Sequence, residues 1–133
     1  MTDVGVGDEI GPEHRVGPHA AQIATYVHSS DVAEPLFRDP TYARDLGYRG
    51  VVVPGPMLTA FVEQFLRHAL DGWRIERLST TFRVPTIAGD TFSLRGVIVE
   101  HHEMADAERI VCEVVIEHAD GERAVTGTAT LRR

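Results

Sequence analysis

The sequence contains no lysine, a single cysteine and no apolar run of membrane-spanning length, and each absence excludes a class of protein. All 13 positive charges are arginine, the formal net charge is −7, and no basic stripe or Lys/Arg cluster is present. We therefore expect neither a nucleic-acid partner nor an anionic-membrane partner. A few of the arginines remain candidates for binding phosphate.

The lone cysteine, Cys112, excludes a disulfide within the chain. It is interpreted as a small residue on a strand, and the alternative is a nucleophile. Nothing at the N-terminus resembles a signal peptide, so the expected compartment is cytoplasmic. The adjacent histidines His101 and His102 would point to opposite faces of a strand, and no other metal-ligand spacing is present, so we expect no metal and no cofactor.

The order of elements predicts an α+β domain. With 133 residues and 43% hydrophobic content, the chain has the size of one domain over 1–133, and its Gly- and Pro-rich start predicts a loose N-terminus over about 1–12. A short strand is expected around 14–16 and a helix over 19–30. Four segments of β-branched content and partial alternation then predict strands over 74–84, 91–100, 109–118 and 123–132.

The segment over 34–70 is the most informative about function. Asp39 and Pro40 predict the start of a short helix, because a carboxylate caps free N–H groups and proline suits the first helical position, and Gly47 ends that helix. A second helix over 56–70 has one broad apolar stripe. We expect four residues of that stripe to be among the most buried, namely Leu58, Phe61, Val62 and Phe65.

At these residues the chain resembles the MaoC-like hydratases and dehydratases, which act on acyl thioesters of coenzyme A or acyl carrier protein. In that family Asp-x-Asn-Pro-x-His-x-Asp precedes Ala-x-x-x-Gly-[Phe/Tyr]-x-Gly, a small-residue turn and a central helix. The matching pieces here are Pro35, Asp39, Ala43, Gly47-Tyr48-Arg49-Gly50, Val53-Pro54-Gly55, Phe82-Arg83-Val84-Pro85 and Gly89-Asp90-Thr91. The resemblance covers nearly the whole chain and implies a hot-dog fold, in which a strongly bent antiparallel sheet wraps around the helix over 56–70.

One departure from the family pattern concerns catalysis. With Pro35 and Asp39 held in register, the family's catalytic His falls on Phe37 and its catalytic Asp falls on Val32. The family's pair activates a water or moves the α-proton, and phenylalanine can do neither. The resemblance therefore implies the fold and the class of ligand, and it leaves the catalytic groups open.

Three ionisable residues near the departure are the candidate catalytic groups: Asp31, His28 and Glu34. Asp31 either acts in the ligand cleft or faces water, and His28 lies one helical turn before it. Glu34 replaces the family's Asn and is either an acid or a solvated loop carboxylate. The substrate-binding residues that the resemblance implies are Gly55, Pro54, Phe37 and Tyr26, with the Gly55 N–H holding the thioester carbonyl oxygen.

Three functions fit these residues. The first is a dyad-lacking subunit of a heteromeric enoyl thioester hydratase, because some members of the resembled family work as pairs in which only one chain carries the dyad. The alternatives are an independent dehydratase with a rearranged site that uses Asp31, and a hot-dog thioesterase, for which Glu63 is the nearest helix carboxylate. We expect an acyl thioester substrate from lipid or polyketide metabolism, and a homodimer or a heterodimer with another hot-dog chain.

Overall fold

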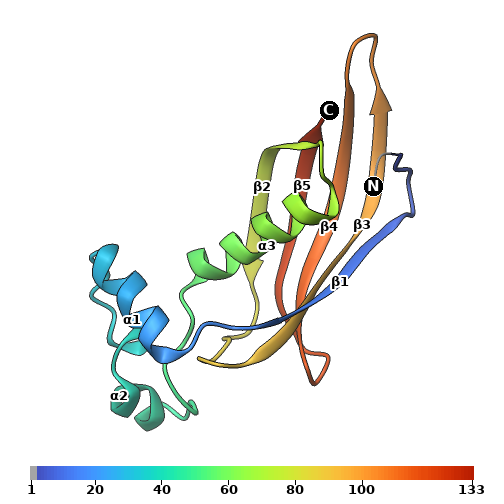
Figure 1. The fold of residues 1–133 in the computed structure, drawn as a ribbon. Coiled ribbons are helices and arrows are strands. Elements are labelled where there is room, and N and C mark those ends of the chain that lie inside the picture. Colours follow the sequence, from blue (N-terminus) through green and yellow to red (C-terminus); the bar gives the residue numbers. More distant parts are fainter. Residues whose placement is uncertain (1–2) are drawn as a thin grey trace.

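The chain folds into an open, five-stranded antiparallel sheet and one long helix, with the shorter helices gathered at one end of the molecule (Figure 1). The computed structural model describes residues 3–133. In chain order the elements are β1 (Glu9–Val16), α1 (Ala20–Ser29), the one-turn 3-10 helix η1 (Pro35–Phe37), α2 (Pro40–Asp45), α3 (Gly55–Ala69), β2 (Arg74–Phe82), β3 (Thr91–Glu103), β4 (Glu108–His118) and β5 (Arg123–Arg132). No helix within residues 3–133 is long and apolar enough to span a membrane.

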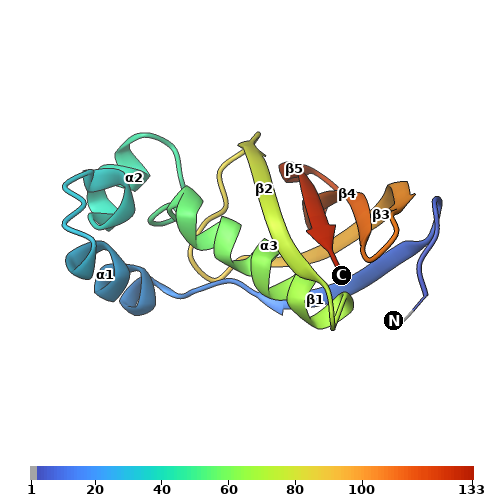
Figure 2. The same cartoon turned by 90° about the horizontal axis from the view of Figure 1, so that it is seen from above.

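The sheet runs in the order β1-β3-β4-β5-β2 and bends around α3, which lies along its inner face (Figure 2). Its two edge strands differ. β2 has nine residues and contains neither glycine nor proline. In β1, Gly11 and Pro12 interrupt the register between Ile10 and Glu13. Because proline has no N–H to donate to a ladder, β2 is the edge better suited to pairing with another strand.

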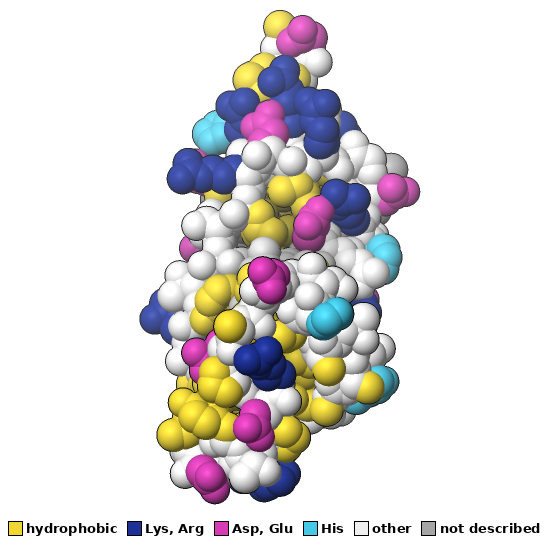
Figure 3. Space-filling view, turned by 90° about the vertical axis from the view of Figure 1, so that its left-hand side faces the viewer, with side chains coloured by type: hydrophobic (Ala, Val, Ile, Leu, Met, Phe, Trp, Pro, Cys, Tyr) yellow, Lys and Arg dark blue, Asp and Glu magenta, His cyan; other side chains and the backbone are white. Residues whose placement is uncertain are grey.

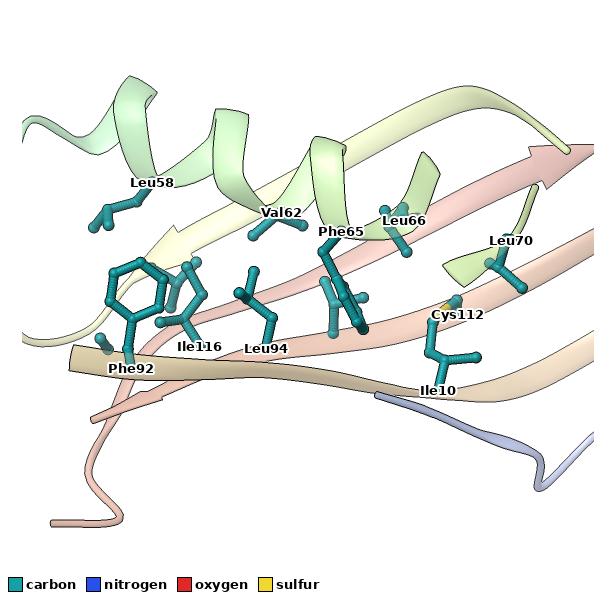
Figure 4. Close-up of a cluster of buried hydrophobic side chains, with 14 of the residues drawn as sticks. Ile10, Leu58, Val62, Phe65, Leu66, Leu70, Phe92, Leu94, Cys112 and Ile116 are labelled. Carbon is teal, nitrogen blue, oxygen red and sulfur yellow. The ribbon is translucent and has the colours of Figure 1, made fainter. Parts of the chain in front are cut away.

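One face of α3 packs against the sheet (Figure 4). Leu58, Val62 and Phe65 are at most 3% exposed and lie on one side of the helix. They meet the inward-facing residues of the strands, which alternate along each strand as the pleat requires; these include Phe92, Leu94, Ile98, Ile110, Cys112, Ile116 and Leu131. The packing holds the N-terminal end of α3 at the edge of the core, where the candidate site lies.

The predicted hot-dog arrangement is confirmed, with the sheet curved around the central helix and not closed. The helix expected over 19–30 and the four C-terminal strands are also present, with small shifts of their ends. Asp39 caps α2 as predicted, because its Oδ1 accepts from the backbone N–H groups of Thr41 and Tyr42 at 3.0 and 3.2 Å. The helix, the strands and the cap follow from local sequence signals, whereas the hot-dog arrangement was implied by the family resemblance.

Two expectations are wrong. The first strand begins at Glu9 and pairs with β3, so part of the segment predicted to be loose belongs to the sheet. The interruption at residues 11–12 breaks the alternation that would have shown it, and residues 1–2 lie outside the described residues. Phe61 is half-buried rather than part of the core: its ring packs edge-on against Phe92, with centroids 5.3 Å apart, and lies under the guanidinium of Arg15.

Candidate functional site

A pocket of about 260 Å³ opens beside the N-terminal end of α3. Its wall is mostly apolar and is built from η1, the Val52–Val53 segment, the start of α3 and the segment that follows β2. The lining residues are Phe37, Val52, Val53, Gly55, Leu58, Phe82, Arg83, Val84, Pro85 and Thr86. A larger hollow of about 750 Å³ lies on the outer face of the sheet and shares none of these residues. The smaller pocket is the candidate site, because it gathers the segments that carry the family pattern.

Phe37 reaches the pocket because a single helical turn holds it there. Glu34 caps η1, and its Oε1 accepts from the backbone N–H of Leu36 at 3.2 Å. The carbonyl of Leu36 accepts from the N–H of Val52 at 3.1 Å, which ties this turn to the run leading into α3. The half-buried Phe37 ring packs against the core. This side of the pocket is therefore apolar at the place where the resembled family carries its histidine.

Gly55 is the first residue of α3 and lies against the ring of Phe82. A Cβ atom at residue 55 would stand 2.7 Å from two ring carbons of Phe82, closer than real Cβ contacts. The first N–H groups of a helix have no intrahelical acceptor and carry its partial positive charge. Phe82 is 51% exposed, so its ring has room to turn aside. Gly55 thus places the start of a helix in the pocket lining, and the absence of a side chain at residue 55 lets the Phe82 ring pack against it.

The structure brings Phe37 and Gly55 together and leaves the other expected substrate-binding residues outside the pocket lining. Pro54 is buried directly before Gly55 and forms the N-cap of α3. Tyr26 is half-buried on α1, where it packs against the core. A role in substrate binding stays a prediction for each of these residues.

The three candidate catalytic residues are exposed, and none of them lines the pocket. Asp31 follows α1 with a φ of 55°, a left-handed conformation that aspartate tolerates better than most residues. Its N–H donates to the carbonyl of His28 at 3.3 Å. The Glu34 carboxylate serves as the cap of η1. Their catalytic roles stay predictions, and the cap gives Glu34 a structural role that the sequence did not predict.

Thr86 is a pocket residue that the sequence did not single out. Within the described part of the chain it is the one buried polar residue. Its Oγ1 lies 2.8 Å from Nε2 of His118, the last residue of β4, and its carbonyl accepts from the N–H of Val53 at 2.8 Å. Hydrogen bonding removes the cost of burying the hydroxyl and fixes the wall of the pocket. Thr86 directly follows the Phe82-Arg83-Val84-Pro85 motif, which could have drawn attention to it. Its partner His118 is far away in the sequence and is identified only from the folded sheet.

The ionisable groups away from the pocket have structural explanations. Cys112 is buried on β4, and burial raises the pKa of its thiol to about 12, which confirms it as a small strand residue and not a thiolate at neutral pH. The pKa of Glu108 is lowered from its ordinary value of 4.5, mainly by the hydrogen bond from Arg133 and secondly by the hydrogen bond with His101. These residues lie at the end of the molecule opposite the pocket.

Two groups of histidine and carboxylate side chains have ligand atoms within 4.8 Å of one another. They are His101, Glu103 and Glu108 on one hairpin, and His118, Asp120 and Glu122 on another. In the first group Glu108 already bonds to Arg133 at 2.7 Å, which offsets its charge. Neither group contributes a residue to the pocket lining.

Comparison with known proteins yields one curated relative and many solved structures of the same shape, while no family model matches the sequence. A UPF0336 protein of Thermobifida fusca (strain YX) is 32% identical in an alignment of 108 positions, and the match covers 73% of this chain and 70% of that protein. This match covers more than two thirds of both chains.

Three solved structures illustrate the shared fold. An (R)-hydratase from A. caviae involved in PHA biosynthesis superposes with a TM-score of 0.84 at 23% identity and covers 98% of each chain. The C-terminally truncated HadBC complex of Mycobacterium tuberculosis, a 3R-hydroxyacyl-ACP dehydratase, gives 0.79 at 23% identity over the full length of both chains. A MaoC-like dehydratase from Rhodospirillum rubrum gives 0.83 at 19% identity, with 97% and 92% of the two chains covered.

Proposed function

Since this chain belongs to the UPF0336 protein family and has the hot-dog fold of the MaoC-like hydratases and dehydratases, we propose that it is the dyad-lacking subunit of a heteromeric enoyl thioester hydratase or dehydratase. One observation carries this proposal. The pocket holds Phe37 where the resembled family has its histidine, and within residues 3–133 no carboxylate, histidine or cysteine lines it. Such a pocket can bind an acyl chain, and its one lining hydroxyl among the described residues, that of Thr86, is already hydrogen-bonded to His118.

Binding of the thioester does not require the missing side chains. The apolar wall accepts a hydrocarbon segment, and the N–H of Gly55 at the start of α3 can donate to the carbonyl oxygen. The pocket of about 260 Å³ is slightly smaller than most ligand sites, for which roughly 300 to 1,000 Å³ is usual. A second hot-dog chain would enlarge it and supply the acid and the base.

The free edge of β2 supports assembly with such a partner. An unpaired strand edge is a template for pairing, and β2 is a nine-residue edge without proline, whose register with β5 shifts only near its start, between Ile75 and Arg77. The HadBC structure, which shares the fold, is itself a complex that carries out dehydration. We propose that this chain joins its partner along β2, with the two clefts near the junction.

The two alternative functions each require a carboxylate that does not line the pocket. A thioesterase would need a carboxylate beside the thioester, but Glu63 bonds to Arg67 at 2.6 Å and does not line the pocket. An independent dehydratase would need Asp31, which is exposed in the loop after α1. Both ideas would require the site to rearrange.

The experiment compares this chain alone with a mixture that contains a hot-dog protein encoded beside it and carrying an intact Asp-x-Asn-Pro-x-His motif. Hydration of a short enoyl-CoA is followed as the ratio of the two chains is varied. We expect almost no activity from this chain alone, and a rate that rises until the two chains are equimolar. Full activity of the partner alone, unchanged by adding this chain, would contradict the proposal.

A further inference from the structure

Arginine side chains form a row across the sheet at the end remote from the pocket. Arg74 on β2 pairs with Arg132 on β5, and Arg132 pairs with Arg109 on β4. Residues paired directly across strands point to the same face, with Cβ atoms about 4.5 to 5.5 Å apart. We call these three residues the arginine row. Figure 3 shows a group of arginine side chains gathered at this upper end of the molecule.

The arginine row faces away from α3 and toward solvent. Ile110 and Leu131, the neighbours of Arg109 and Arg132 along their strands, are fully buried in the core. Successive side chains of a strand alternate between faces, so the arginines lie on the outer face. The side chains of Arg109 and Arg132 are 39% and 41% exposed. A ligand in solution can therefore reach their guanidinium groups.

The charges of this region do not balance. Glu76 lies between two members of the row, with its Oε2 3.2 Å from Nε of Arg109 and its Oε1 3.8 Å from Nη1 of Arg132. Arg74 and its neighbour Arg77 are exposed, and neither makes an ion pair within residues 3–133. Like charges directly opposite one another destabilise a sheet. Glu76 pairs with two of these four arginines, and a multiply charged anion would stabilise the remaining positive charge.

We propose that the arginine row, together with Arg77, binds the phosphate groups of a nucleotide of the kind that coenzyme A carries. The planar guanidinium fork matches phosphate oxygens with two parallel hydrogen bonds. Three neighbouring strands place the row over two strand spacings, roughly 10 Å, which is wide enough for more than one phosphate. Glu76 already pairs with two of the arginines. A ligand with a single carboxylate would neutralise only one more positive charge, whereas several phosphate charges would neutralise the rest.

The location of the row ties it to the proposed function, on which this part of the inference rests. The row begins at Arg74, whereas Phe82 at the other end of β2 lines the pocket. The nine residues of β2 span about 26 Å between these ends. When two β2 edges pair antiparallel about a two-fold axis, the start of one strand lies beside the end of the other. The row would then lie at the same end of the joined sheet as the partner's cleft, on the outer face, and a thioester carrier that passes around the strand ends would reach it.

The test measures binding of coenzyme A to the purified chain by calorimetry at low ionic strength, with 3′,5′-ADP and pantetheine as partial ligands. The double variant Arg74→Gln/Arg132→Gln should weaken the affinity for coenzyme A and for 3′,5′-ADP about tenfold or more. The control Arg44→Gln/Arg123→Gln removes the same charge from two exposed arginines and should change it less than about twofold. Pantetheine, which has no phosphate, should not compete.

Equal losses in the two double variants would overturn the proposal, because attraction to net charge alone would explain them. Binding of pantetheine without 3′,5′-ADP would also overturn it, as would row-dependent binding of an acidic carrier protein without row-dependent binding of coenzyme A. If circular dichroism shows the row variant unfolded, Arg77→Gln replaces it, and an unchanged affinity in that variant overturns the proposal.

The phosphate site and the proposed function fail separately. A chain that binds coenzyme A through the arginine row, but adds no activity to a dyad-bearing partner, keeps the site and rejects the subunit role. A chain that completes an active pair, yet binds coenzyme A equally well without the row, keeps the subunit role and rejects the site.

Discussion

At the scale of single residues, Phe37 and Gly55 make different contributions to the pocket that they both line. Phe37 adds apolar surface to the pocket, and the family resemblance predicts that it stands where the family carries its catalytic histidine. Gly55 begins α3 in the pocket lining, and under the proposed function its N–H holds the thioester carbonyl oxygen. Under the proposed function, the pocket binds a thioester and a partner chain supplies the side chains that transform it.

The Gly55→Ala variant tests the backbone donor. The new methyl group would stand 2.7 Å from the Phe82 ring, so the ring must swing into or away from the pocket. We expect a change of less than about 1.5 kcal/mol in the free energy of unfolding, since Phe82 is half exposed, but a loss of about tenfold in acyl-CoA affinity. Urea unfolding and calorimetric titration measure the two effects.

Gly50→Ala is the matched control, because a Cβ atom there meets Ile87 at 3.5 Å, an ordinary contact. It should leave both unfolding and affinity close to those of the original chain. If Gly50→Ala and Gly55→Ala weaken acyl-CoA binding equally, the donor at residue 55 has no special role.

Cys112 provides a test of burial. Because burial raises the pKa of its thiol to about 12, we expect no reaction with a neutral thiol reagent at about pH 8 while the chain is folded. Addition of urea should expose the thiol and release the full stoichiometric signal. Rapid labelling without denaturant would show that β4 opens or that the thiol is accessible.

The sequence identified individual pocket residues only where a motif lay nearby along the chain. Phe37 and Gly55 were found because each lies within a few residues of a recognisable motif. The pairing of Thr86 with His118 was not found, because it joins residues 32 positions apart. The arginine row was missed for the same reason: Arg74, Arg109 and Arg132 are scattered in the sequence and become neighbours only when strand register is known.

At the scale of elements, α3 and the two edge strands determine where the site can form. The apolar stripe of α3 was readable from its period, and Leu58, Val62 and Phe65 are buried as expected. The depth of burial at each position was not readable, since Phe61 lies at the margin of the stripe under Arg15. Likewise, the interruption at residues 11–12 concealed the start of β1.

The variants Phe65→Ala and Phe61→Ala compare a core position of α3 with a position at the margin of the core. Phe65 is 1% exposed, so the truncation leaves a cavity, and we expect a loss of roughly 3 to 5 kcal/mol in the free energy of unfolding. Phe61→Ala removes the same atoms from a half-buried position and should cost clearly less. Equal losses in the two variants, measured by urea denaturation, would mean that the packing of α3 differs from this structure.

At the scale of the whole molecule, an incomplete pocket and an open sheet edge point to the same requirement. The pocket lacks ionisable groups that could serve as acid and base, and β2 has an unpaired edge that begins at the arginine row and ends at the pocket. A second chain joined along β2 would supply the missing groups and bring the row beside a cleft that needs an anchor. Both features would be completed by a partner chain.

The most direct measurement uses the equimolar complex with a dyad-bearing hot-dog partner and removes the three candidate catalytic residues of this chain. The triple variant His28→Gln/Asp31→Asn/Glu34→Gln should keep the rate of enoyl-CoA hydration within about twofold, since these residues are exposed and do not line the pocket. Replacing the partner's motif histidine should lower the rate by about 10² to 10⁴, the usual contribution of general acid–base catalysis. If instead the triple variant abolishes hydration while remaining folded and bound to its partner, this chain carries catalytic groups of its own and the account is wrong.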